Sequence, residues 1–497
     1  MSDLWKYLSD EKKTRKKETY RIEAATDSSG EGMGSGGRKM AKMKKESGTN
    51  EEMLRSGPFR TLVGRLCVPT VLIMLVMVLY HMADVFFIGQ TGDPNKVAAV
   101  TLASPMFSIL SGLGVLLGNG GCTAISLALG KGEYGTIKKI SAFAIWGAIA
   151  IGFLFAAVVL PLMNPICNLL GANDETRGFT AEYLRVIAIG APVIMLTNVV
   201  PALIRADGST TDSMIGNMLG TVLNIALDPL LISVFGMGVS GAAIATVAAN
   251  VVSLCYYVYF LRTKGKIYSV SPKDISFEKA VAWTVISLGL PMSCATVLGS
   301  VSSTVANNLM MQYGSIAVAG QSVAGRIGQM ISMTVMGICM GMQPAISFNY
   351  SAKNYKRLTE ILAKTTGLAV VAGTILSALC LIFRDQLLNA FLDNPNVLEI
   401  GRVCLFASIV IGPFLGFYQI CTTYLQASGK SKEAVIVSLL EKGIIYIPML
   451  FLMSWLFKMY GIIFSATVTT VLSAVVALVF CYKDYRKELK DIKEWGE

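Results

Sequence analysis

Two aspartates stand inside long apolar stretches of the sequence, Asp84 within "YHMADVFFIGQTG" and Asp228 within "NIALDPLLI". A charged side chain at membrane depth costs about 2.5–3.5 kcal/mol on insertion scales, so such residues usually mark a path for ions or protons. Each aspartate is therefore a candidate for binding a cation or carrying a proton.

Polar partners accompany these acids at helical spacing. Asn224 lies four residues before Asp228 and shares its helix face, and Thr246 belongs to the next apolar segment. If the three segments meet, the oxygen atoms suit Na+, and two close carboxylates suit H+ because both cannot ionise easily. We predict a cation-coupling site for Na+ or H+ formed by Asp84, Asn224, Asp228 and Thr246. The alternative is that these side chains only cap broken helices or hydrogen-bond across the bundle.

Tyr80 and His81 lie four and three residues before Asp84, so both neighbour it on a helix. His81 is the single histidine and could relay protons. We assign Tyr80 and His81 as a proton relay or a substrate contact, against the alternative of a neutral, hydrogen-bonded histidine. Pro69 precedes them and removes a backbone hydrogen bond, which predicts a bend in this helix.

A second group of charges, Glu441, Lys442 and Arg326, falls in later apolar segments. Adjacent residues do not share a face of an α-helix. Snorkelling to the membrane surface or local pairing, with Arg326 as a candidate partner, is therefore a simpler interpretation than a direct role in coupling.

The composition indicates which elements position these residues. Of 497 residues, 53% are hydrophobic and 15% charged, whereas soluble proteins carry roughly 25% charge. A bilayer core of ~30 Å needs about 20 apolar residues per helix. The prediction is an all-α polytopic membrane protein with twelve spans: 66–90, 97–128, 138–161, 178–204, 212–235, 239–262, 281–312, 316–348, 357–383, 397–427, 432–458 and 461–482.

The net charge of +11 is concentrated in the two tails and in alternate loops. Basic loops stay on the cytoplasmic side, so we expect both termini to be cytoplasmic. The same distribution argues against a nucleic-acid partner. Residues 1–55, which include the Gly/Ser-rich "DSSGEGMGSGG", are expected to form a disordered tail, and 483–497 a second tail.

An internal repeat divides the chain. "LIRADGSTTDSMI" (203–215) aligns with "YLQASGKSKEAVI" (424–436) at an offset of 221 residues. An even number of helices per repeat gives both halves the same orientation, so the axis relating them runs along the membrane normal. We predict two six-helix lobes, 56–262 and 281–482, joined by a cytoplasmic loop at 263–280.

The sequence resembles the multidrug and toxic compound extrusion (MATE) transporters through "YHMADVFFIGQTG", "RADGSTTDSM", "NIALDPLLI", "GVSGAAIAT" and "GMQPAISFNYSAKNYKR". It looks closer to the branch named after the DNA-damage-inducible protein, in which an Asp, an Asn–Asp pair and a Thr bind the coupling ion. The resemblance implies export of organic cations in exchange for inward Na+ or H+, by a monomer in the bacterial plasma (inner) membrane, without a cofactor. The matching residues are Asp84, Asn224, Asp228 and Thr246.

Other residues are candidates for lining a substrate cavity. Met330 and Met333 lie on one predicted helix and could repack around varied shapes, although ordinary helix packing explains them as well. Asn307, Gln312 and Tyr418 are weaker candidates.

Two other function classes fit the sequence less well. A lipid or lipid-linked oligosaccharide flippase of the same superfamily would need a cationic cavity, and Arg326 is the one plausible deep arginine. An enzyme would need a nucleophile or metal constellation, whereas the chain has one histidine and no HExxH or GxGD motif.

Overall fold

The structure, a computed structural model, describes residues 50–89, 94–265, 267–275, 278–389 and 395–494. From Met53 onward the chain forms one compact unit. In the described ranges all regular structure is helical, as expected from the sequence.

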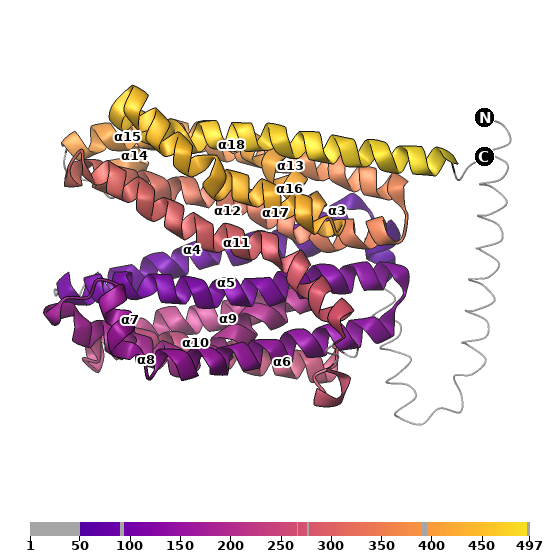
Figure 1. Ribbon diagram of the computed structural model, residues 1–497, viewed down its shortest axis with the longest axis horizontal. Coiled ribbons are helices and arrows are strands. Elements are labelled where there is room, and N and C mark those ends of the chain that lie inside the picture. Colours follow the sequence, from indigo (N-terminus) through magenta and orange to yellow (C-terminus); the bar gives the residue numbers. More distant parts are fainter. Residues whose placement is uncertain (1–49, 90–93, 266, 276–277, 390–394, 495–497) are drawn as a thin grey trace. The chain divides into compact units, whose positions relative to one another are not determined.

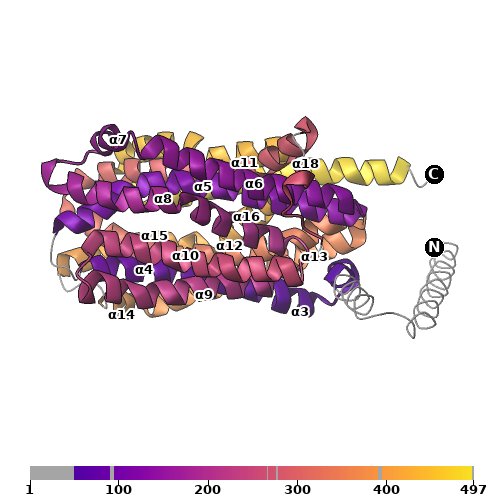
Figure 2. The ribbon, with the colours of Figure 1, turned by 90° about the horizontal axis from the view of Figure 1, so that it is seen from below.

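The first six spans form one bundle, the lower one in Figure 1. Span 1 is broken into α3 (Phe59–Leu62), the π-turn η1 (Val63–Cys67) and α4 (Val68–Gly89). The others are α5 (Pro94–Lys131), α6 (Tyr134–Val159), α8 (Asp174–Arg205), α9 (Thr210–Pro229) with the π-turn η2 (Leu230–Val234), and α10 (Gly238–Thr263). The short helix α7 (Met163–Leu169) precedes α8. Figure 2 shows α5, α6 and α8 together on one side of this bundle and α9 with α10 on the other.

The second bundle repeats this order after the 3-10 turn η3 (Pro272–Asp274). Its elements are α11 (Lys279–Met311), α12 (Ser315–Ser351), α13 (Tyr355–Ile382), α14 (Arg384–Asn389), α15 (Pro395–Val410), α16 (Gly412–Ala427), α17 (Ser431–Leu439), the π-turn η4 (Leu440–Ile444) and α18 (Tyr446–Glu494).

Two irregular regions, the bend between α15 and α16 and the break within α18, decide how many spans are counted. Length and hydropathy identify ten spanning helices among the described residues, or eleven when α15 and α16, bent by 45°, count as one span. The segment Ser431–Asp484 is counted there as one span of 54 residues, yet a bilayer core needs only about 20. Lys458 breaks it with φ 52° and ψ −132°. Two spans in this segment bring the total to the expected twelve.

Large apolar side chains remain exposed along these helices, among them Phe153 (62%), Trp283 (71%) and Trp455 (80%). Soluble monomers rarely expose contiguous apolar surface of this kind. The exposure therefore fits helices that contact lipid.

The internal repeat is visible in where helices begin. α6 and α13 start at Tyr134 and Tyr355, and α9 and α17 start at Thr210 and Ser431, in both cases 221 residues apart. The turn before the latter pair repeats too, because Gly208 and Gly429 both adopt positive φ, 89° and 80°. Two bundles of six helices with the same chain order are thus confirmed.

The bundles touch where glycines permit close approach. A Cβ on Gly120 of α5 would lie 1.9 Å from the carbonyl oxygen of Val285, and one on Gly289 of α11 would lie 1.8 Å from that of Leu116. Nearby, the amide of Gln343 in α12 donates to the hydroxyl of Thr123 in α5 at 2.8 Å. This crossing of α5 with α11 and α12 holds the two bundles together.

Candidate functional site

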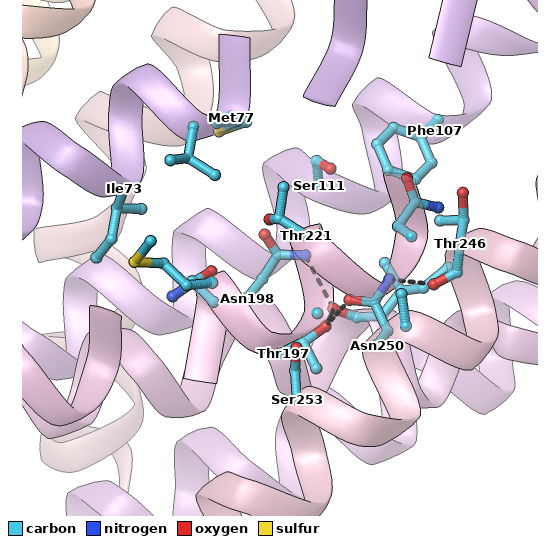
Figure 3. Close-up of a pocket in the computed structure, with 17 residues that line it drawn as sticks. Ile73, Met77, Phe107, Ser111, Thr197, Asn198, Thr221, Thr246, Asn250 and Ser253 are labelled. Carbon is cyan, nitrogen blue, oxygen red and sulfur yellow. Dashed lines mark hydrogen bonds between the residues drawn. The ribbon is translucent and has the colours of Figure 1, made fainter. Parts of the chain in front are cut away.

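A cavity of about 170 Å³ lies inside the first bundle, between α4, α5, α8, α9 and α10. Pockets that bury drug-sized ligands usually measure about 300–1,000 Å³. The cavity in this conformation therefore suits an ion with a few water molecules better than a whole drug. Figure 3 shows Ile73 and Met77 on one side of it and Thr246 and Asn250 on the other.

The polar part of the cavity wall consists of neutral amides and hydroxyls. Thr197 donates from Oγ1 to Oδ1 of Asn250 at 2.6 Å, and Nδ2 of Asn250 donates to the main-chain oxygen of Thr246 at 2.8 Å. Asn198 donates to the main-chain oxygen of Ile194 at 2.8 Å. Of these bonds, the one from Thr197 to Asn250 ties α8 to α10, and the other two fix the amides of Asn250 and Asn198 against their own helices (Figure 3).

Three of the four predicted coupling residues lie together, and two of them belong to this wall. Asp228 is fully buried, and Asn224 and Thr246 are exposed by only 2% and 3%. The amide of Asn224 finds two partners when its nitrogen faces Asp228, donating to Oδ2 at 3.2 Å while its oxygen accepts from the main-chain nitrogen of Thr246 at 3.2 Å. Asn224 and Thr246 also line the cavity. The i, i+4 spacing in α9 and the packing of α9 on α10 produce this cluster.

The oxygen atoms of this cluster fit a hard cation, but the amide of Asn224 has to rotate before its oxygen can take part. The carboxylate of Asp228 and the hydroxyl of Thr246 are oxygen donors of the kind that Na+ prefers. Asn224 presents its nitrogen to the carboxylate, which stabilises the ionised form of Asp228. A half-turn of that amide would present its oxygen to a cation instead.

The fourth coupling residue falls where the structure describes only the backbone. Asp84, Tyr80 and His81 belong to α4, and their side chains lie outside the described part of the chain. Pro69 is the second residue of α4, which begins directly after the π-turn η1. Proline and π-turns both interrupt the regular hydrogen-bond ladder and are the usual causes of a bend.

The residues proposed to line a cavity in the second bundle lie apart from this cavity. Asn307 and Gln312 are exposed, Met330 is 43% exposed, and Met333 is half-buried. Tyr418 is buried and donates from its hydroxyl to Oε2 of Glu441 at 3.2 Å.

Sequence reasoning missed most of the polar wall. Thr197, Asn198, Asn217 and Asn250 all line the cavity and were not candidates. Thr197 and Asn198 form a polar pair inside the apolar stretch "IMLTNVVPA", and Asn250 interrupts another apolar stretch, "ATVAANVV". Such polar residues inside predicted spans were the available signal.

Comparison with known proteins agrees with this architecture. The sequence profile of the MatE family matches the chain twice, over residues 69–230 and 291–452, one match in each bundle. The chain belongs to the MatE family. The offset of 222 residues between the two matches agrees with the internal repeat, and MATE proteins are membrane transporters rather than enzymes. The branch within the family remains a prediction.

Curated relatives of this MatE chain carry a functional name. The multidrug export protein MepA of Staphylococcus saprophyticus is 32% identical over 416 residues, 84% of this chain and 92% of that protein. MepA of Staphylococcus aureus is 31% identical over 414 residues, 83% and 91% of the two chains.

Solved structures share the fold. An outward-facing multidrug resistance MATE family transporter superposes with a TM-score of 0.82 at 22% identity, over 88% of this chain and 97% of that one. MATE in complex with MaL6 gives 0.83 at 22% identity, over 90% and 99%. This likeness confirms the twelve-span, two-bundle fold of a multi-pass membrane protein.

Proposed function

We propose that the chain is a secondary active multidrug efflux antiporter, which exports cationic amphipathic compounds in exchange for inward Na+ or H+. The observation that carries the proposal is the buried Asp228–Asn224–Thr246 cluster at the wall of a cavity inside a MatE-family bundle. The names of the MepA relatives support multidrug compounds as the exported class. The chain needs no cofactor in this scheme.

The exchange follows from competition for one buried carboxylate. An ionised Asp228, with no exposed surface, must be balanced by a cation. A coupling ion and an organic cation cannot both occupy the same carboxylate, so the binding of one favours release of the other. The membrane potential adds about 2.3 kcal/mol per 100 mV for each charge that moves inward.

Asp84 is proposed as the second acid of this site. Spans 1 and 5 run in the same direction through the membrane, and Met77 of α4 and Thr221 of α9 both line the cavity. Asp84 and Asp228 each come seven residues later, a rise of about 10 Å along either helix. Seven residues make almost two turns, so helical periodicity predicts the same face of α4 for positions 77 and 84. Tyr80 and His81 are proposed to relay protons or contact substrate beside it.

The transport cycle is proposed to alternate access between the two lobes, 56–262 and 281–482. Bending at Pro69 and η1 would link ion binding to movement of α4. The positive-inside rule supports cytoplasmic termini in a bacterial plasma membrane, and the proposed unit is a monomer.

A flippase for anionic lipid-linked compounds receives less support. The side chains that line the cavity of the first bundle are apolar or neutral, and the buried charge that contacts its wall, through Asn224, is the carboxylate of Asp228. Arg326, the candidate for gripping a phosphate, is exposed on α12.

Efflux of ethidium from cells tests the proposal. Asp84→Asn and Asp228→Asn are expected to reduce efflux to background at wild-type expression, while the exposed Glu133→Gln serves as a control that retains it. Replacing Na+ by K+ at fixed pH then separates Na+ from H+ coupling. Undiminished efflux by both aspartate variants would reject the assigned site.

A further inference from the structure

A second buried carboxylate lies in the other bundle, and its partner is the residue next to it in sequence. Nζ of Lys442 lies 2.7 Å from Oε1 of Glu441, while the hydroxyl of Tyr418 donates to Oε2 at 3.2 Å. On a regular α-helix, neighbouring side chains point about 100° apart. Both residues lie in the π-turn η4, which changes their relative direction. The local pairing expected for Glu441 thus occurs, with Lys442 as its partner.

Neighbouring helices hold this π-turn in place. The hydroxyl of Ser302 in α11 donates to the main-chain oxygen of Lys442. Gly443 packs against Leu298, since a Cβ there would lie 2.3 Å from its Cδ2. A π-turn is a costly irregularity that occurs frequently at functional sites. Here it places a carboxylate inside the lobe.

The two charges differ in how accessible they are. The side chain of Glu441 is 6% exposed, whereas that of Lys442 is 42% exposed. A carboxylate that deep needs a cation beside it, because removing one partner of a buried pair leaves an uncompensated charge. The lysine, on a flexible four-carbon stem, can leave without disturbing the core. Another cation could then take its place while the site stays neutral.

By the internal repeat, Tyr418, Glu441 and Lys442 occupy positions equivalent to three residues in the cavity wall of the first bundle. At the offset of 221 residues, Tyr418 corresponds to Thr197, Glu441 to Gly220 and Lys442 to Thr221. Thr197, Gly220 and Thr221 all line the cavity of the first bundle.

The residue that faces Lys442 from α11 also has an equivalent in the wall of the first cavity. Lys442 contacts the position of Gly299, since a Cβ there would lie 3.9 Å from Cδ of the lysine. At the 222-residue offset of the prolines in spans 1 and 7, Gly299 corresponds to Met77, which also lines the first cavity.

We infer that Glu441 is a second recognition site for the ammonium or phosphonium group of an organic cation, and that Lys442 is an internal cation that occupies it until substrate arrives. Tyr418 is the positioning residue, since its hydroxyl fixes one carboxylate oxygen. This inference rests on the proposed export of organic cations, and it assigns to the second bundle a role in recognising substrate that is separate from coupling at Asp228.

Equilibrium binding of tetraphenylphosphonium to the purified full-length protein tests the inference. Lys442→Met keeps the length of the side chain and removes the competing charge, so it should bind the probe roughly 3- to 10-fold more tightly. Lys442→Arg keeps the charge and should bind like wild type. Glu441→Gln keeps the size and the hydrogen-bond partners and should bind about tenfold more weakly.

The double variant separates recognition from folding. In the Glu441→Gln background, Lys442→Met should no longer tighten binding, because the lysine has no carboxylate to occupy. Unchanged or weaker binding by Lys442→Met, or an equal gain in both backgrounds, would overturn the inference. If the wild-type protein bound no organic cation at all, the proposed function itself would fail. Equal binding of the probe by the wild type and all four variants would instead overturn only the inference about Glu441 and Lys442.

Discussion

Gly120→Ala tests whether the two bundles are held by their glycine crossing. A Cβ at this position would lie 1.9 Å from the carbonyl oxygen of Val285, and real Cβ contacts essentially never fall below 3.0 Å. α5 and α11 would therefore have to separate by about 1.1 Å, the difference between these two distances. The obstacle is main chain, which cannot rotate away as a side chain could. Overpacking of this kind costs about 1–3 kcal/mol.

Thermal unfolding in detergent measures this cost. At roughly 2–4 °C per kcal/mol, the midpoint for Gly120→Ala should fall by about 2–12 °C, and Gly289→Ala, which would meet Leu116 at 1.8 Å, should behave alike. Gly367→Ala in α13 is the matched control, since no atom lies within 4 Å of its Cβ. Because alanine favours a helix by about 0.5–1 kcal/mol over glycine, the control should be unchanged or slightly stabilised. Wild-type stability in both crossing variants would refute the close contact.

Two further predictions concern other parts of the first bundle. Burial raises the pKa of Asp207, in the turn between α8 and α9, from 3.8 to about 6. The folded state thus holds this proton more tightly than the unfolded state, and stability should fall, on the order of 2 kcal/mol, as pH rises from about 4 to 6. The unfolding midpoint should then drop less between pH 4.5 and 7.5 in Asp207→Asn than in wild type; an equal drop would contradict the assignment. Asn224→Ala removes the amide that donates to Asp228, a bond to a charged group worth about 1.5–3 kcal/mol; the ionised carboxylate is then less stable, so the H+ concentration for half-release of bound ethidium should fall about tenfold or more. An unchanged half-release concentration would remove Asn224 from the site.

The spans were predictable because a bilayer imposes a length and an apolar composition on each helix. α6 and α13, expected at 138–161 and 357–383, are found at Tyr134–Val159 and Tyr355–Ile382. The short helices α7 and α14 escaped prediction, since six or seven residues satisfy no such criterion. The bend between α15 and α16 lies beside Pro413, where the lost N–H weakens the ladder.

The candidate site was predictable only where local spacing determines geometry. Asn224 and Asp228 share a face in any α-helix, and the structure places them together. The bond from Thr197 to Asn250 joins residues 53 positions apart, so it depends on how α8 packs on α10. The pairing of Glu441 with Lys442 depends on a π-turn, and rules for α-helix faces do not anticipate it.

Release of bound ethidium from the purified protein tests the central claim most directly. With wild type, adding Na+ at fixed pH, or lowering pH at fixed Na+, should displace the dye along a saturable curve, because both cations compete for the carboxylate of Asp228. The Asp228→Asn variant should keep its residual dye throughout both titrations, while Glu133→Gln follows the wild-type curve. If Asp228→Asn released ethidium along the wild-type curve, coupling through this buried acid would be contradicted.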